Sequence, residues 1–252
     1  MTDLSDAAVA RALIACLDYT NLDEDCSETD IAVLCDRAVT PAGPVAAICI
    51  WPRFVPLARG MLPPGIRIAT VVNFPNGGDL PDKTWHDTAA ALVDGADEID
   101  MVIDHRRLAE PEYVERQVRR VKEAAATVPL KAILETGELA GPAEMAVAAE
   151  AALAGGADFL KTSTGKTAVS ATPEAAKALL AVIAAHGGNA GFKASGGIRS
   201  FEDARAYRAL AEEACGVGWA TPERFRIGAS GVLADLMAVA TGARRQAGKA
   251  GY

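Results

Sequence analysis

Charged side chains interrupt four segments that otherwise have the composition of buried β-strands. They are Asp100, Lys131, Lys161 and Lys193. An unpaired buried charge is costly, so these residues form either an internal salt-bridge network or a reactive site. Because they recur on neighbouring predicted strands, near the carboxyl ends where barrel enzymes build their active sites, we favour the reactive site.

Two lysines held close together in a dry site acquire a specific chemistry. Each ammonium disfavours protonation of the other, and burial acts in the same direction. Lowering a lysine pKa by about three units takes roughly 4 kcal/mol, which a second ammonium and partial burial can supply. The resulting neutral amine attacks a carbonyl carbon and forms a Schiff base. A nearby carboxylate or lysine then moves the proton that the protonated imine has made acidic.

Three turns rich in small residues follow predicted strands, and each is expected to lead into a helix N-terminus, which indicates an anion site: residues 162–167, 195–200 and 228–232. Free backbone N–H groups and helix N-termini bind phosphate, and barrel enzymes commonly place that site after the seventh and eighth strands. Lys166 and Arg199 add positive charge. One such loop alone would indicate only a tight turn. A nucleotide-binding P-loop is rejected, because its pattern needs glycine where this chain has Leu160.

The elements that must position these residues alternate along the chain. Short apolar runs recur about every 30 residues, which is the size of a βα unit. They are nearly continuous, as in parallel strands covered on both faces. The eight predicted strands are residues 15–19, 45–51, 67–73, 98–104, 130–136, 158–163, 191–195 and 225–229.

The segments between these runs have helical periodicity, as in residues 112–128. Residues 172–174 and 200–203 carry helix N-cap signals. The phrase Gly-Ala-Asp occurs at 95–97 and again at 156–158, each time where a helix should end and a strand begin. The pattern predicts a single-domain (β/α)8 TIM barrel over residues 1–243 and a mobile tail over 244–252. An open doubly wound sheet is the alternative, but no glycine follows the first predicted strand.

Composition excludes several classes of protein. The 252 residues are 50% hydrophobic and 23% charged, enough to build a globular core, and the net charge of −8 argues against nucleic-acid or anionic-membrane binding. The acidic N-terminus predicts no signal peptide, and no apolar run predicts a membrane span. Five cysteines without paired spacing predict free thiols and a cytoplasmic location. The three histidines show no metal-ligand spacing, so we expect no metal.

Seven phrases, in order along nearly the whole chain, resemble the 2-deoxyribose-5-phosphate aldolases, a family of class I aldolases. The phrases LKAILETG, FLKTSTG and FKASGGIR include the three lysines named above. All seven lie at residues 17–22, 46–53, 69–75, 95–102, 130–137, 159–165 and 192–199.

The resemblance implies a role for particular residues. Lys161 matches the Schiff-base lysine, and Asp100 with Lys193 matches the pair that transfers protons. The positions that match substrate-lining residues are Asp18, Thr20, Cys49, Thr162 and Tyr252. The positions that match the phosphate-binding loops are Gly165, Lys166, Gly196, Gly197, Arg199, Gly228 and Ser230.

The implied reaction is the reversible cleavage of 2-deoxy-D-ribose 5-phosphate to D-glyceraldehyde 3-phosphate and acetaldehyde, without a cofactor. We expect small phosphorylated sugars or aldehydes as ligands and a homo-oligomer, with a dimer favoured. Two positions need comment: Gly231 stands where many relatives have a second serine, and Tyr252 matches a terminal tyrosine that reaches the site in some members. Two alternatives stay open: another Schiff-base barrel enzyme, such as a transaldolase-like protein, and a non-catalytic sugar-phosphate sensor.

Overall fold

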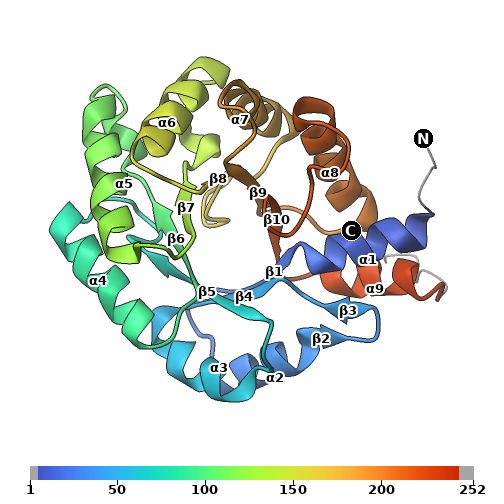
Figure 1. The fold of residues 1–252 in the computed structure, drawn as a ribbon. Coiled ribbons are helices and arrows are strands. Elements are labelled where there is room, and N and C mark those ends of the chain that lie inside the picture. Colours follow the sequence, from blue (N-terminus) through green and yellow to red (C-terminus); the bar gives the residue numbers. More distant parts are fainter. Residues whose placement is uncertain (1–4, 244–252) are drawn as a thin grey trace.

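The computed structural model describes residues 5–243 and shows a closed barrel of parallel strands surrounded by helices (Figure 1). Each strand pairs with its neighbours in chain order, and the last strand pairs with the first. The eight barrel strands are β1 (Leu17–Asn21), β4 (Ala47–Ile50), β5 (Arg67–Val72), β6 (Glu98–Val102), β7 (Leu130–Ile133), β8 (Phe159–Lys161), β9 (Gly191–Ser195) and β10 (Phe225–Ala229). The predicted TIM barrel is therefore confirmed, and the predicted tail, residues 244–252, lies outside the described residues.

The helices form an outer ring, in which α1 packs beside α9 and so joins the two ends of the described chain (Figure 1). The α-helices are α1 (Asp6–Ala15), α2 (Glu28–Arg37), α3 (Val55–Met61), α4 (Pro81–Val93), α5 (Pro111–Ala125), α6 (Pro142–Ala154), α7 (Pro173–Ala185), α8 (Phe201–Cys215) and α9 (Val232–Ala240). Short 3-10 turns occupy η1 (Pro52–Phe54), η2 (His105–Arg107) and η3 (Thr136–Glu138). Among residues 5–243, no helix is long and apolar enough to cross a membrane.

The helix signals in the sequence correspond to real caps. Ser200 and Asp203 form a reciprocal capping box at the start of α8, and the Thr172 hydroxyl caps α7. The predicted helix 112–128 ends earlier, at Ala125, because Ala126 takes a left-handed backbone angle of φ +53°. The sequence pattern did not predict the helix α1 or the short hairpin formed by β2 (Val39–Thr40) and β3 (Gly43–Pro44).

The repeated Gly-Ala-Asp phrase builds the same junction twice. Gly95 and Gly156 have φ of +106° and +95°, which lets each chain leave its helix. The carboxylates that follow accept backbone N–H groups from the preceding strand: Asp97 from Ile68, and Asp158 from Leu130, both at 2.8 Å. The repeat is therefore a structural device that joins a helix to its next strand at the amino end of the barrel.

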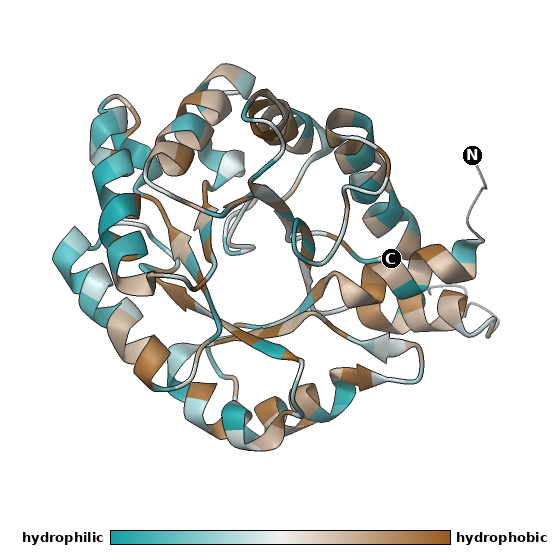
Figure 2. Ribbon diagram, in the orientation of Figure 1, coloured by the Kyte–Doolittle hydropathy of each residue, from teal (hydrophilic) through white to brown (hydrophobic). Residues whose placement is uncertain are grey.

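Apolar packing is divided between two places. The main core lies between the strands and the helices, where α7 and α9 are rich in hydrophobic residues and α5 carries hydrophilic residues (Figure 2). A second, smaller cluster consists of Leu22, Ala47, Cys49, Ala69 and Val71. Four of these are alternate residues of β4 and β5, so they face the barrel interior. One side of the interior is therefore small and apolar.

Candidate active site

The other side of the barrel interior is charged. Alternation along the strands turns every second side chain inward, which brings charges from six strands together. Each of these side chains is at most 2% exposed: Asp18, Glu98, Asp100, Lys131, Lys161, Lys193 and Arg226. The sequence analysis singled out four of them as interruptions of apolar strands and reached Asp18 only through the family resemblance.

Asp100 lies at the centre of this cluster. One carboxylate oxygen accepts a hydrogen bond from Lys131 at 2.7 Å. The other accepts from both Lys161 and Lys193, each at 2.7 Å. Lys193 also donates to Asp18 at 2.5 Å. The three residues predicted as catalytic, Lys161, Asp100 and Lys193, are therefore in direct contact through a single carboxylate oxygen.

A deeper layer of ion pairs supports this group. Arg226 donates to Asp18 at 2.6 Å and to Glu98 at 2.7 Å, and Lys131 lies 2.6 Å from Glu98. Sequence reasoning missed Glu98 and Arg226, although the spacing of Glu98 and Asp100 on one strand places both on the same face. Glu98 and Arg226 are both charged residues inside apolar strand segments, β6 and β10, which is the same signal that pointed to Asp100 and the three lysines.

Lys161 differs from the other two lysines in how many carboxylates it contacts. Lys131 lies close to Asp100 and Glu98, and Lys193 to Asp100 and Asp18. Among the described residues, Asp100 is the one carboxylate that pairs with Lys161, and it also pairs with Lys193. Burial lowers the pKa of Lys161, and the Lys193 ammonium adds to this shift, whereas Asp100 only partly opposes it. Lys161 is thus the lysine of the cluster whose neutral form is favoured.

The other lysines behave differently from the expectation. Burial lowers the pKa of Lys193, but Asp100 and Asp18 outweigh it and hold the pKa above its ordinary value. Burial is likewise outweighed at Lys131, by Asp100 and Glu98. The expected lowered pKa is therefore found at Lys161, whereas at Lys193 the carboxylates of Asp100 and Asp18 reverse the net shift. Lys131 also does not lie near a carboxyl end, because it is the second residue of β7.

The lowered pKa of Lys161 predicts a pH profile. Only the neutral amine attacks a carbonyl, so imine formation should rise with pH through the pKa of Lys161 and reach half its maximum below 10.5, the ordinary lysine value. The measurement is the initial rate of borohydride-trapped adduct on Lys161 against pH, with Nα-acetyl-lysine as reference. A midpoint at or above that of the reference amine would contradict the assignment.

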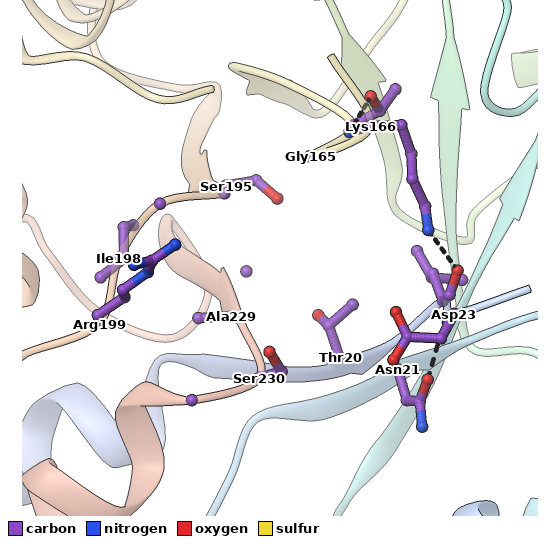
Figure 3. A pocket seen from close by; sticks show the side chains of 16 residues that line it. Thr20, Asn21, Asp23, Gly165, Lys166, Ser195, Ile198, Arg199, Ala229 and Ser230 are labelled. Atoms are coloured by element: carbon purple, nitrogen blue, oxygen red, sulfur yellow. Dashed lines mark hydrogen bonds between the residues drawn. The ribbon is translucent and has the colours of Figure 1, made fainter. Parts of the chain in front are cut away.

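A pocket of about 450 Å³ opens at the carboxyl end of the barrel (Figure 3). The ends of β1, β9 and β10 and the loop after β8 contribute its walls. It contains all of the predicted phosphate residues, together with Thr20: Gly165, Lys166, Gly196, Gly197, Arg199, Gly228 and Ser230. Asp18 and Lys193 lie two residues before lining residues on their strands, and Lys161 lies three residues before Thr164 of the following loop, so the charged cluster lies below this pocket, toward the amino end of the barrel.

Backbone amides in the pocket are available to a ligand. Within residues 5–243, no hydrogen bond uses the N–H groups of Gly165, Gly197, Ile198 or Ser230. By contrast, the N-terminus of α8 is already capped, because Asp203 accepts from the amides of residues 199 and 200 and Asp235 from that of residue 201. The expected anion site therefore uses the glycine turn before α8 rather than the helix end itself.

Lys166 spans the mouth of the pocket. Its ammonium group donates to the carbonyl oxygen of Leu22 at 2.7 Å, at the end of β1 (Figure 3). The loop that carries it does not lead directly into a helix, as the sequence suggested, since α7 begins only at Pro173. Thr20 was expected just after the first strand and instead lies inside β1.

The remaining predicted residues have distinct places. The Thr162 hydroxyl is buried and pairs with Ser195, accepting its N–H at 3.0 Å, so it braces β8 against β9. Cys49 is buried on the apolar side with its sulfur 4.0 Å from an oxygen of Asp100. A side chain at Gly228 would meet the Ser195 hydroxyl at 2.6 Å and Lys193 at 3.0 Å, so only glycine fits there. Tyr252 lies outside the described residues.

The fold and the cluster together define a class of protein: a (β/α)8 barrel enzyme with a buried lysine of lowered pKa below a pocket lined by backbone amides that are unpaired in the described chain. The model of the DeoC/LacD family of aldolases matches residues 12–238. The chain belongs to this family, and it is an aldolase, a carbon–carbon lyase.

Individual relatives agree with the family. The chain is 50% identical over 249 residues to the deoxyribose-phosphate aldolase of Agrobacterium fabrum (strain C58 / ATCC 33970), covering 96% of each chain. An apo crystal structure from Toxoplasma gondii ME49 superposes with a TM-score of 0.85 at 29% identity, over 94% of this chain and 98% of that one. The tetrameric deoxyribose phosphate aldolase of Aeropyrum pernix gives a TM-score of 0.72 at 27% identity, over 93% and 92%.

Proposed function

We propose that this enzyme reversibly cleaves 2-deoxy-D-ribose 5-phosphate to D-glyceraldehyde 3-phosphate and acetaldehyde through a Schiff base on Lys161. The observation that carries the proposal is the position of Lys161, whose pKa is lowered, beneath a pocket with unpaired backbone amides. The name of the relative from Agrobacterium fabrum supports this choice of substrate.

In the direction of synthesis, the neutral Nζ of Lys161 attacks the carbonyl carbon of acetaldehyde. Uptake of a proton and loss of water from the carbinolamine leave an iminium ion, which acidifies the adjacent methyl group. The small apolar wall that includes Cys49 and Val71 adjoins Asp100 and suits a two-carbon donor. Removal of a methyl proton gives the enamine that attacks the acceptor aldehyde, and hydrolysis then frees the product.

Asp100 and Lys193 carry the proton in this proposal. Burial raises the pKa of Asp100, but three ammonium groups outweigh it and hold the pKa well below its ordinary value. Asp100 is therefore an ionised base next to the nitrogen of Lys161. Lys193 keeps its proton and is hydrogen-bonded to the same oxygen of Asp100. It can therefore donate a proton to the reacting group when the Asp100 carboxylate accepts one.

The phosphate group is proposed to occupy the turns after β9 and β10. The amides of Gly197, Ile198 and Ser230 are unpaired within the described chain, and Arg199 and Lys166 bring charge to the same pocket. Lys166 would exchange the Leu22 carbonyl for a phosphate oxygen. The phosphate at one end and Lys161 at the other then hold the sugar between them.

Restoring a hydroxyl at position 231 is expected to tighten phosphate binding. A side chain at Gly231 meets no atom within 4 Å, and its φ of −90° suits any residue. The Gly231→Ser enzyme should fold normally and show a KM for the phosphorylated substrate lower by about three- to tenfold, since a typical hydrogen bond contributes a net free energy of about 0.5–1.5 kcal/mol. The measurement is KM for 2-deoxyribose 5-phosphate, with Gly231→Ala as control. An equal KM in the serine and alanine variants would refute a phosphate contact at this position.

The test of the proposed function is a cleavage assay with product identification, followed by borohydride reduction in the presence of acetaldehyde and peptide mapping. Cleavage of 2-deoxyribose 5-phosphate with a reduced two-carbon adduct on Lys161 supports the proposal. An active enzyme whose adduct maps to another lysine would remove Lys161 from the mechanism. Activity only on a longer sugar phosphate would favour another Schiff-base enzyme.

Two further predictions accompany this function. We infer a cytoplasmic location from the five cysteines, which are all free thiols in the described chain. We also infer a homo-oligomer, with a dimer favoured. The tetrameric assembly is that of the Aeropyrum pernix relative. Light scattering would measure the oligomeric state of this protein.

A further inference from the structure

Glu135 is a buried carboxylate that the mechanism does not use. It follows β7, the strand that pairs with the strand of Lys161, and is only 1% exposed. Unlike the carboxylates of the charged cluster, Glu135 forms no ion pair within residues 5–243. A carboxylate buried among neutral donors is costly unless those donors are well placed, so its partners need an explanation.

Within residues 5–243, the hydrogen-bond partners of the Glu135 carboxylate all belong to the loop after Lys161. The Glu135 carboxylate accepts the Thr164 N–H at 3.3 and 3.4 Å, the Thr164 hydroxyl at 2.5 Å and the Thr167 hydroxyl at 3.2 Å. The backbone of Glu135 is left-handed, with φ +50°, which is unusual for a residue other than glycine. The residues on either side of Glu135 continue the backbone hydrogen bonds to the neighbouring chain segment: the N–H groups of Leu134 and Thr136 donate to the carbonyl oxygens of residues 161 and 162.

The Thr164 hydroxyl links the Glu135 carboxylate to the backbone of the pocket wall. While donating to Glu135, it accepts the Lys166 N–H at 3.0 Å. This closes the turn 164–166 around Gly165, whose φ is +77° and whose N–H makes no bond to another described residue. Thr164, Gly165 and Lys166 all line the pocket. The orientation of one unpaired amide and one ammonium therefore depends on a carboxylate that does not itself line the pocket.

We propose that Glu135 is a positioning residue for the phosphate group: its carboxylate fixes the turn 164–167, and thereby the Gly165 amide and the Lys166 side chain. This inference rests on the proposed function, because it assumes a phosphorylated substrate. It makes Glu135 act on substrate binding rather than on the chemistry at Lys161, whose strand is held separately by the pairing of Thr162 with Ser195.

The test compares a phosphorylated and an unphosphorylated substrate in the Glu135→Gln enzyme. The amide keeps the size of the side chain but presents an NH2 group to donors that need an acceptor. We expect KM for 2-deoxyribose 5-phosphate and the inhibition constant of inorganic phosphate both to rise about tenfold, because a charge-assisted acceptor is lost. The kcat with that substrate, and kcat/KM for 2-deoxyribose, should stay within about twofold. Glu138→Gln, an exposed change of the same kind on η3, is the matched control.

Two variants keep the inference testable if Glu135→Gln does not fold. Thr164→Val removes the linking hydroxyl and should raise KM for the phosphorylated substrate selectively, whereas Thr164→Ser should restore it. Equal losses with both substrates would show a general structural role and overturn the inference, as would an unchanged KM. The proposed function fails separately, if the wild-type enzyme does not cleave 2-deoxyribose 5-phosphate.

Discussion

Replacing Lys161 with methionine is expected to abolish cleavage while leaving the fold as stable as before. Methionine has a similar length but no amine, so no Schiff base forms and turnover should fall by on the order of 10⁵-fold or more, as when a covalent nucleophile is removed. No other lysine of the cluster can replace it. Lys131 lies within 4 Å of three carboxylates and Lys193 of two, and these carboxylates hold both pKa values above the ordinary range.

The expected stability follows from the charges of the buried cluster. Within the charged cluster in the barrel interior, three carboxylates face four cations: Asp18, Glu98 and Asp100 against Lys131, Lys161, Lys193 and Arg226. Removing Lys161 leaves three against three, so no carboxylate loses its only partner. Removing one member of a buried ion pair is costly when it leaves the other charge unpaired, and here Asp100 keeps its hydrogen bonds to Lys131 and Lys193.

The measurements are kcat, borohydride trapping and the free energy of unfolding in urea. Leu160→Met, a change on the same strand that leaves the amine in place, is the control for altered packing. If Lys161→Met kept even a hundredth of wild-type turnover, or formed a trapped adduct elsewhere with turnover intact, covalent catalysis at this residue would be refuted.

Replacing Asp100 with asparagine is expected to damage both stability and turnover. The carboxylate is the shared acceptor of three lysines, each at 2.7 Å. Without it, the buried cations face only Asp18 and Glu98, and loss of one member of a buried ion pair costs about 3–5 kcal/mol. Loss of the base that moves the proton should lower kcat by about 10²- to 10⁴-fold.

A third readout separates the chemical role of Asp100 from its structural role. Asp100 raises the pKa of Lys161, opposing burial and Lys193. In the Asp100→Asn enzyme, the pKa of Lys161 should therefore fall further, and trapping with acetaldehyde should reach half its maximum at a lower pH than in the wild type. Adduct formation would persist while turnover is lost.

The control is Asp87→Asn, which removes a partly exposed partner of Lys83 on α4 and should cost at most about 1 kcal/mol. An Asp100→Asn enzyme with wild-type turnover would exclude Asp100 from proton transfer. A midpoint for trapping that moved to higher pH would show that Asp100 lowers, rather than raises, the basicity of Lys161.

The sequence by itself determined the barrel and most of the candidate site. The barrel strands are short and continuously hydrophobic, so their number and spacing could be predicted, and each of the eight barrel strands overlaps a predicted one. The sequence pointed to Lys161, Lys193 and Asp100 because an unpaired charge inside a buried strand is costly. The glycine turns after the last two strands could also be predicted, because their small residues leave backbone N–H groups accessible to an anion.

Only the tertiary structure decided which lysine is the weak base. A pKa depends on distances between groups, and Lys161 differs from Lys193 by one missing carboxylate contact across the barrel, which no spacing along the chain reveals. The same holds for Arg226 and Glu98, which become partners only when the barrel closes. Glu135 shows the limit most clearly: its residue type is ordinary for a loop, and its burial against the turn after Lys161 exists only in the folded chain.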